Sequence, residues 1–248
     1  MKIRIGGVPY GVGAPLLEGL ESDPSIDFVR IPPTELVRDL RDGTLDAALV
    51  SSIEAFRRPD YGTVAGLSIA SRGPARSVRA FKKTGPIRSV GLDSGSATTV
   101  VLLRILLAAG RLGEVAEDVE FDTISPTVDP DSLPHDLVML IGDCGLHANS
   151  GRPDILDLGA CWFDWIGLPF VWALWLIRPE VESADILAKL HEARRAALEA
   201  NIDDGTDGAI YYDFGAAELA GLRRFRDAAA ALDLADGSIE PRLLDLNP

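Results

Sequence analysis

Short apolar segments alternate with helical segments along the first part of the chain, and this order constrains the fold more than any other feature. Segments 3–5, 26–31 and 45–50 have the alternating or fully apolar character of strands. Helices are expected between them, at 15–20, where a proline opens the segment, and at 36–41, which ends before an Asp-Gly pair. An order of strand, helix, strand, helix, strand predicts a parallel sheet of the α/β class.

The same order continues through the rest of the chain. Further elements are expected as strands at 64–70, 77–81, 87–92 and 137–141, and as a long apolar helix at 100–109. The last third, 184–231, has helical spacing of Ala, Leu, Glu and Arg, with a turn-like break at 201–208. No repeat with a period of about 20–50 residues is visible, which excludes a solenoid.

Acidic residues outnumber basic ones, 38 to 24, which gives a formal charge of −14. Nucleic acids and anionic membranes are held mainly by Lys and Arg, so we expect neither as a partner. The longest apolar segment, 166–177, contains a proline and is too short to span a bilayer. Glycines and prolines interrupt the N-terminal segment before any apolar run of signal-peptide length, so a cytoplasmic location is expected.

Metal and cofactor motifs are also missing from the sequence. Cys144 and Cys161 belong to no CxxC motif or Cys/His cluster, and the three histidines are scattered. We therefore expect no metal site and no disulfide framework. The glycine-rich segment 5–13 lacks the lysine of a P-loop and does not fit GxGxxG, so no nucleotide cofactor is expected.

Hydroxyl side chains gather where two of the expected strands end. The two groups are Ser51 and Ser52, and Ser94, Ser96, Thr98 and Thr99. Ligands of open α/β sheets bind at the carboxyl ends of strands, where the next helix presents free N–H groups and a positive dipole end. These residues could therefore hold a carboxylate without a formal positive charge, although capping a helix is the ordinary role of Ser and Thr.

Two further features have more than one interpretation. Asp143 follows a buried strand, where it could cap a helix, accept a hydrogen bond from a substrate hydroxyl, or act as a base. All four tryptophans lie between Trp162 and Trp175. They could pack the core between two lobes or stack on a ring-shaped ligand.

Six segments, in this order and spacing, resemble the MqnA/MqnD family of menaquinone biosynthesis, and within it the chorismate dehydratase branch. They are VPYGVGAPL, DGTLDAALVSSIEAF, SVGLDSGSATTVVLLRILL, DLVMLIGDCGL, DLGACWFDWIGLPFVWALW and YYDFGAAELAGLRRFRDAA. The resemblance covers nearly the whole chain. Its most specific part is the fifth segment, which extends from Asp157 to Trp175.

The resemblance implies a two-lobe, periplasmic-binding-protein-like fold of type II with two hinge crossovers. Lobe one would comprise residues 1–85 plus 178–248, and lobe two residues 86–177. The crossovers would lie near 84–89 and near 169–175. No cofactor is implied, and the oligomeric state is left open.

The ligand implied by the resemblance is a small carboxylate that would lie between the lobes. Residues from lobe one would be Tyr10, Ser51 and Ser52; from the other side would come the 94–99 loop and Asp143. Pro169 and Phe170 are expected to contribute from the second crossover. The implied reaction is dehydration of chorismate to 3-[(1-carboxyvinyl)oxy]benzoate, and no catalytic residue is assigned.

Three positions depart from the family pattern. Val12 stands where an Asn is expected, and Ala97 where an Arg is expected; Lys82 is an additional cation that we expect to replace the lost charge. An amide can hold a hydroxyl and an Arg can bind a carboxylate bidentately, so their loss removes polar contacts. These departures keep two alternatives open: a non-catalytic binder of a small carboxylate in a diverged paralogue, and the later enzymatic step of the same family.

Overall fold

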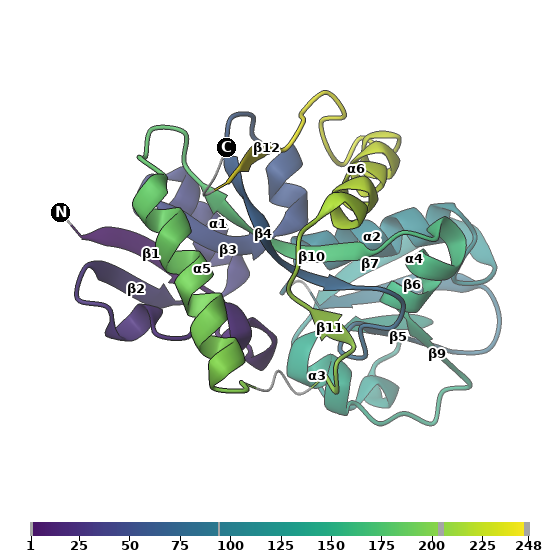
Figure 1. Ribbon diagram of the computed structural model, residues 1–248. Helices are drawn as coiled ribbons and strands as arrows, with labels where there is room; N and C mark the ends of the chain where they lie inside the picture. Colours follow the sequence, from purple (N-terminus) through teal and green to yellow (C-terminus); the bar gives the residue numbers. More distant parts are fainter. Residues whose placement is uncertain (1, 94, 203–205, 246–248) are drawn as a thin grey trace.

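The computed structural model describes residues 2–93, 95–202 and 206–245, which form two β-sheets with helices around them (Figure 1). The first sheet has seven strands in the order β11-β4-β10-β3-β1-β2, with β12 beside β4. Its strands are β1 (Ile3–Gly7), β2 (Ile26–Arg30), β3 (Ala47–Ser51), β4 (Gly62–Ser71), β10 (Phe170–Ile177), β11 (Ile210–Tyr211) and β12 (Arg242–Leu244). This sheet contains both ends of the described chain.

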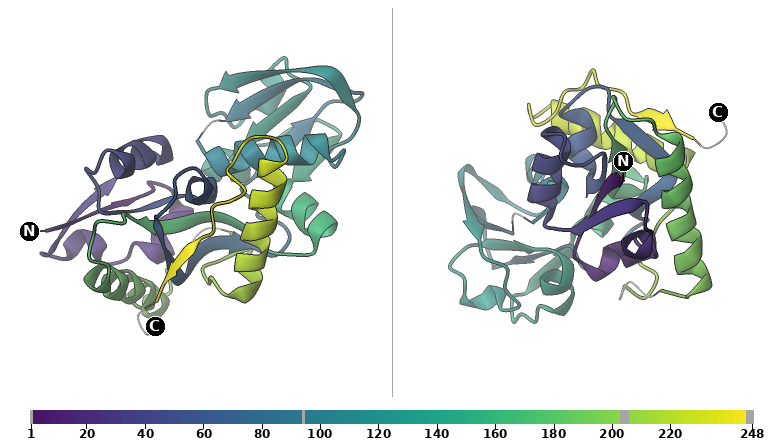
Figure 2. Two further views of the ribbon diagram at one scale, coloured as in Figure 1. Left: turned by 90° about the horizontal axis from the view of Figure 1, so that it is seen from above. Right: turned by 90° about the vertical axis from the view of Figure 1, so that its left-hand side faces the viewer.

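The second sheet has five strands in the order β7-β6-β8-β5-β9. They are β5 (Arg79–Lys82), β6 (Ile87–Asp93), β7 (Val115–Ile124), β8 (Leu137–Leu140) and β9 (Asp154–Asp157). Figure 2 shows this sheet, in teal, to one side of the first. Both sheets are mixed. β1 pairs in parallel with β2 and β3, and β6 with β7 and β8, whereas β10 and β5 pair antiparallel with their neighbours. The parallel strands with helices between them confirm the α/β class.

Six α-helices and four short 3₁₀ helices connect the strands in the described residues. The α-helices are α1 (Pro33–Arg41), α2 (Ala97–Ala108), α3 (Gly142–His147), α4 (Leu158–Ile166), α5 (Ala184–Glu199) and α6 (Ala216–Ala230). The 3₁₀ helices are η1 (Gly11–Leu16), η2 (Leu20–Ser22), η3 (Ser52–Phe56) and η4 (Pro130–Ser132). No helix in the described residues is long and apolar enough to cross a membrane.

The helix expected at 15–20 is wrong, because the chain forms η1 and η2 there instead. Gly19 between them adopts φ 79°, a left-handed conformation that ends a helix. Pro15 lies inside η1 and cannot donate a backbone hydrogen bond to the preceding turn. The segment therefore remains a tight 3₁₀ connection that leads from β1 over the end of the sheet.

The chain crosses between the sheets twice. It leaves the first sheet after Ser71 and enters the second at Arg79, so the crossover expected near 84–89 is wrong. Those residues connect β5 to β6 within the second sheet. The chain passes back to the first sheet between α4, which ends at Ile166, and β10, which begins at Phe170. This second crossover lies close to the expected position, 169–175.

The lobe limits of 1–85 plus 178–248 and 86–177 stay a prediction. Sheet membership differs from them at two strands, because β5 belongs to the second sheet and β10 to the first. In β10, antiparallel pairing with both β3 and β4 places the returning chain in the middle of the first sheet. The strand that follows the second crossover therefore has a strand of the first sheet on each side.

Candidate functional site

A cavity of about 640 Å³ lies between the two sheets. Its walls are mainly apolar, with side chains from both lobes that include Val8, Val50, Ile69, Val78, Ile141 and Trp172. Five hydroxyl side chains also line it: Tyr10, Ser51, Ser77, Ser96 and Thr99. Mainly apolar walls with a few polar groups are typical of a small-molecule site.

The two predicted hydroxyl groups meet across the junction of the sheets. The Ser51 and Ser96 hydroxyl oxygens are 3.4 Å apart. Ser96 is the N-cap of α2, where its side chain accepts hydrogen bonds from the Thr99 backbone N–H at 3.3 Å and the Thr99 hydroxyl at 3.1 Å. The end of β3 and the start of α2 thus place Ser51, Ser96 and Thr99 on one edge of the cavity.

Ser52 and Thr98 join the lobes behind this edge and do not line the cavity. Their hydroxyl oxygens are 3.2 Å apart, and both residues are fully buried. Thr98 accepts a hydrogen bond from the Ile53 N–H at 3.0 Å, and Ser52 donates one to the Val171 carbonyl at 2.7 Å. These contacts tie η3, α2 and β10 together, so both residues hold the site in shape and do not contact the cavity.

A second chamber of about 800 Å³ adjoins the first and carries acidic groups. Tyr10, Gly95, Ile141 and Gly142 line both chambers, whereas Asp143 lines only the second. Asp143 is exposed in the first turn of α3. The carboxylate predicted at this strand end, that of Asp143, therefore lies at the second chamber.

Asp93, which the sequence interpretation missed, is the buried carboxylate of this second chamber. Its side chain is 3% exposed and accepts hydrogen bonds from the N–H groups of Gly95 at 3.0 Å and Ile141 at 3.4 Å. Burial raises the pKa of Asp93, and the two N–H groups oppose that shift. Asp93 thus fixes the loop before α2 against the end of β8.

The Tyr10 phenol lies where the two chambers meet. Burial raises the pKa of Tyr10, and the nearby charges of Asp93 and Asp143 raise it further. The hydroxyl group therefore stays protonated through the neutral pH range and can donate a hydrogen bond to a ligand.

We expect Tyr10→Phe to lower kcat/KM by about tenfold, the usual effect of losing one ligand hydrogen bond. The matched control is Tyr211→Phe, because the Tyr211 hydroxyl donates to Glu218 at 2.8 Å and does not line the cavity. Steady-state kinetics on both variants checks this. Equal losses in the two variants would contradict a role for Tyr10 at the ligand.

Val12 lines the main cavity, and its backbone carbonyl accepts a hydrogen bond from the Tyr212 hydroxyl at 3.0 Å. Three other predicted residues lie outside the cavity: Lys82, Pro169 and Phe170. Ser94 is outside the described residues.

The Lys82 side chain makes its polar contacts away from the cavity, within the second lobe. Its ammonium group is 3.4 Å from an Asp154 carboxylate oxygen and 3.2 Å from the Lys83 carbonyl. In the antiparallel pairing of β5 with β8, Lys82 lies opposite Leu137, at the start of β8, whereas the cavity is at the other end of that strand. Lys82 therefore does not replace the charge missing at position 97.

Phe170 belongs to the core. It is 1% exposed, and its ring centroid is 5.3 Å from that of Trp162 and 4.4 Å from that of Trp172. Trp162 and Trp175 are also fully buried, so the core interpretation of the tryptophans holds for these two. Trp172 lines the cavity and donates from its indole N–H to the Ser71 hydroxyl at 3.1 Å, so a ring ligand could contact it.

The arrangement of the two sheets defines the class of protein, which has the periplasmic-binding-protein fold, and the cavity lies between the sheets. The periplasmic aliphatic sulphonate binding protein SsuA from Escherichia coli matches with a TM-score of 0.59 and 16% identity, over 95% of each chain. A protein from Archaeoglobus fulgidus matches with a TM-score of 0.60 and 18% identity, over 94% of this chain and 98% of that one.

Sequence comparison is more specific. A family model described as menaquinone biosynthesis matches residues 3–207, and the chain belongs to this family. A chorismate dehydratase from Thermus thermophilus is 31% identical over 222 residues, which are 80% of this chain and 79% of the relative. A chorismate dehydratase from Campylobacter jejuni is 26% identical over 237 residues, 89% of this chain and 91% of the relative.

Proposed function

We propose that this protein is a chorismate dehydratase, which converts chorismate to 3-[(1-carboxyvinyl)oxy]benzoate. The observation that carries the proposal is the interlobe cavity of about 640 Å³, with apolar walls and a row of hydroxyl groups, in a chain 31% identical to a relative with that name. On this proposal the enzyme is a carbon–oxygen lyase, and a cytoplasmic location stays a prediction.

The chemistry suits such a cavity. The reaction breaks the bond between a ring carbon and its hydroxyl group, removes a ring proton, and leaves an aromatic ring and water. Aromatisation makes the reaction downhill, so the protein mainly has to orient the ring and hydrogen-bond the departing hydroxyl. Apolar walls and hydroxyl donors are suited to these two functions.

The hydroxyl groups have complementary roles in this proposal. Tyr10 lines both chambers, and its hydroxyl group is a donor for the departing hydroxyl in this proposal. Ser51, Ser96 and Thr99 form a second polar group, on the edge where the lobes meet. None of the described residues that line the main cavity is charged, so orientation and neutral hydrogen bonds dominate there.

A non-catalytic carboxylate binder is the second candidate. The same absence of a carboxylate or an imidazole among the described residues of the main cavity favours it, because no conventional general base lies there. The fold is compatible with this role, since SsuA is named as a sulphonate binding protein.

Calorimetry and ultraviolet spectroscopy on one sample separate the two candidates. Purified protein is titrated with chorismate, and the same mixture is followed for the absorbance of a benzoate product. Binding with a rise in product absorbance that scales with protein concentration supports the dehydratase. Binding with unchanged absorbance supports the binder, and the absence of both contradicts the two proposals.

A further inference from the structure

We propose that a pocket beside the main cavity is a carboxylate subsite in which Arg57 provides the ligand-facing cation. This inference rests on the proposed function, because that substrate carries two carboxylates. The pocket measures about 480 Å³ and shares Pro33 and Ser51 with the main cavity. A ligand whose ring fills the main cavity can therefore extend a second group past Ser51.

The charges of this pocket set it apart from the main cavity. Arg41, Glu54 and Arg57 line it, and their formal charges sum to +1 in a protein of net charge −14. Glu54 is 1% exposed and accepts hydrogen bonds from two guanidinium nitrogens of Arg41, at 2.7 and 2.6 Å. Arg41 therefore neutralises the buried carboxylate, and the remaining positive charge belongs to Arg57.

Arg57 is available to a ligand. Its guanidinium group makes no hydrogen bond or ion pair with any of the described residues. The residue directly follows η3, and its backbone N–H donates to the Glu54 carbonyl at 3.1 Å, which fixes the start of the side chain. A free guanidinium at the wall of a pocket is suited to bidentate binding of a carboxylate.

Ala97 contributes to this pocket from the other lobe. It lines the same pocket at the first turn of α2, so the pocket is formed by both lobes. Its side chain is a single methyl group, so Ala97 itself brings no charge to the pocket. Leaving a carboxylate unpaired in the main cavity is costly, and Lys82 lies at the far end of β5, so Arg57 is the cation that the geometry offers.

The test is calorimetry with three probes on wild type, Arg57→Gln and Arg58→Gln. The probes are the dicarboxylate 3-[(1-carboxyvinyl)oxy]benzoate and its two halves, 3-methoxybenzoate and 2-phenoxyacrylate, each with one of the carboxylates. Arg58 is the matched control, since it is the next exposed arginine and does not line either pocket. Thermal melts of both variants verify that the fold is intact.

We expect Arg57→Gln to weaken binding of the dicarboxylate by about tenfold or more and to weaken only one of the two halves. Arg58→Gln is expected to bind all three probes like the wild type. The proposal is overturned if Arg57→Gln binds the dicarboxylate normally, if both halves weaken equally, if Arg58→Gln has the same effect, or if the wild type does not bind the dicarboxylate.

The outcomes also separate this inference from the proposed function. If Arg57→Gln turns over chorismate normally, with an unchanged KM, the proposed subsite is refuted and the proposed dehydratase function is not affected. If Arg57→Gln loses affinity for the dicarboxylate and the wild-type protein does not dehydrate chorismate, the proposed function is refuted and the proposed subsite is supported.

Discussion

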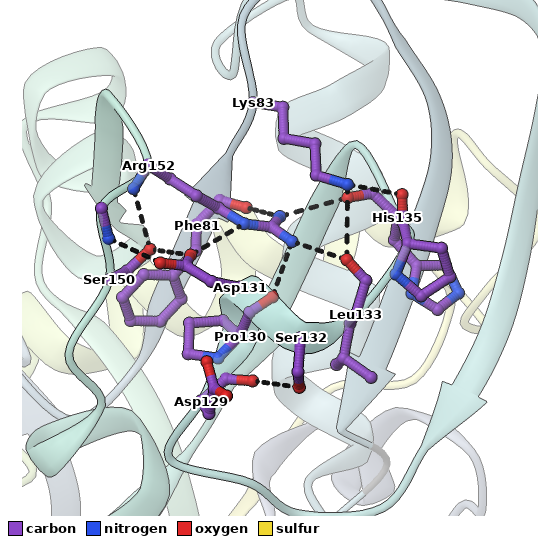
Figure 3. A network of polar contacts seen from close by, with 12 residues as sticks. Phe81, Lys83, Asp129, Pro130, Asp131, Ser132, Leu133, His135, Ser150 and Arg152 are labelled. Atoms are coloured by element: carbon purple, nitrogen blue, oxygen red, sulfur yellow. Dashed lines mark hydrogen bonds and ion pairs between the residues drawn. The ribbon is translucent and has the colours of Figure 1, made fainter.

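Replacing Arg152 by Met is expected to lower the free energy of unfolding by roughly 3 kcal/mol or more. The Arg152 side chain is 4% exposed and lies inside the second lobe, just before β9 (Figure 3). Its guanidinium group donates to four backbone carbonyls, those of Phe81 at 2.8 Å, Pro130 at 2.6 Å, Leu133 at 3.1 Å and His135 at 3.2 Å. One side chain therefore satisfies acceptors from β5, η4 and the turn before β8.

The size of the expected loss in unfolding free energy follows from the polar groups that Arg152→Met leaves without the guanidinium donor. Met fills similar space, but all four carbonyls lose the Arg152 donor, and Asp131, whose carboxylate is 3.4 Å from the guanidinium, loses its ion pair. The Pro130 and Leu133 carbonyls keep one donor each, the Leu133 N–H at 3.4 Å and the Lys83 ammonium group at 3.3 Å. In a protein of this length the loss corresponds to a drop in melting temperature of about 6–12 °C. Arg88→Met is the control, because Arg88 is exposed in the same lobe. A difference below about 1 kcal/mol between the two variants in urea unfolding would show that solvent satisfies these carbonyls.

Filling the main cavity is expected to have the largest effect on activity. Ala173 lies in the middle of β10, between Ser51 of β3 and Ile69 of β4, and lines the cavity. In Ala173→Phe the ring would occupy the space that the ligand needs. We expect kcat/KM to fall more than 100-fold, because the new phenyl ring prevents the substrate ring from taking its place in the cavity.

A matched strand variant separates occlusion from general damage. Ala116 in β7 has the same intermediate exposure as Ala173 and is remote from the main cavity, so Ala116→Phe is expected to retain activity. Kinetics and melting curves are compared for the pair. An active Ala173→Phe protein would place the ligand outside this cavity, whereas an inactive one that melts within a few degrees of the wild type supports it.

The sequence predicted the α/β fold because its buried strands are short, apolar and followed by helix signals. It did not predict β7, whose ten residues include four acidic ones, because this edge strand pairs only with β6 and leaves its acidic side chains in solvent. The strand β9 was missed as well. Its four residues begin and end with Asp, so they lack the apolar run that marked the other strands.

The site could be predicted only where it follows the ends of strands. Ser51 and Ser96 were found because both follow predicted strands. The prediction for Lys82 was made without strand directions: β5 runs antiparallel to β8, which takes its last residue away from the cavity. Ser77 and Trp172 reach the main cavity through the crossovers and the packing of the lobes, which a single sequence does not specify. Asp93 ends β6, so a signal for it was present in the sequence: a carboxylate directly after a predicted strand.

The most direct test of the central claim is proton NMR of chorismate incubated with the purified protein, with Ala173→Phe as the blank. The account predicts that the signals of the ring diene disappear and that aromatic signals of 3-[(1-carboxyvinyl)oxy]benzoate appear in equal amount, with the two vinyl protons retained. Chorismate that stays intact with the wild-type protein, or that yields a product without the vinyl group at a rate above the blank, would contradict it.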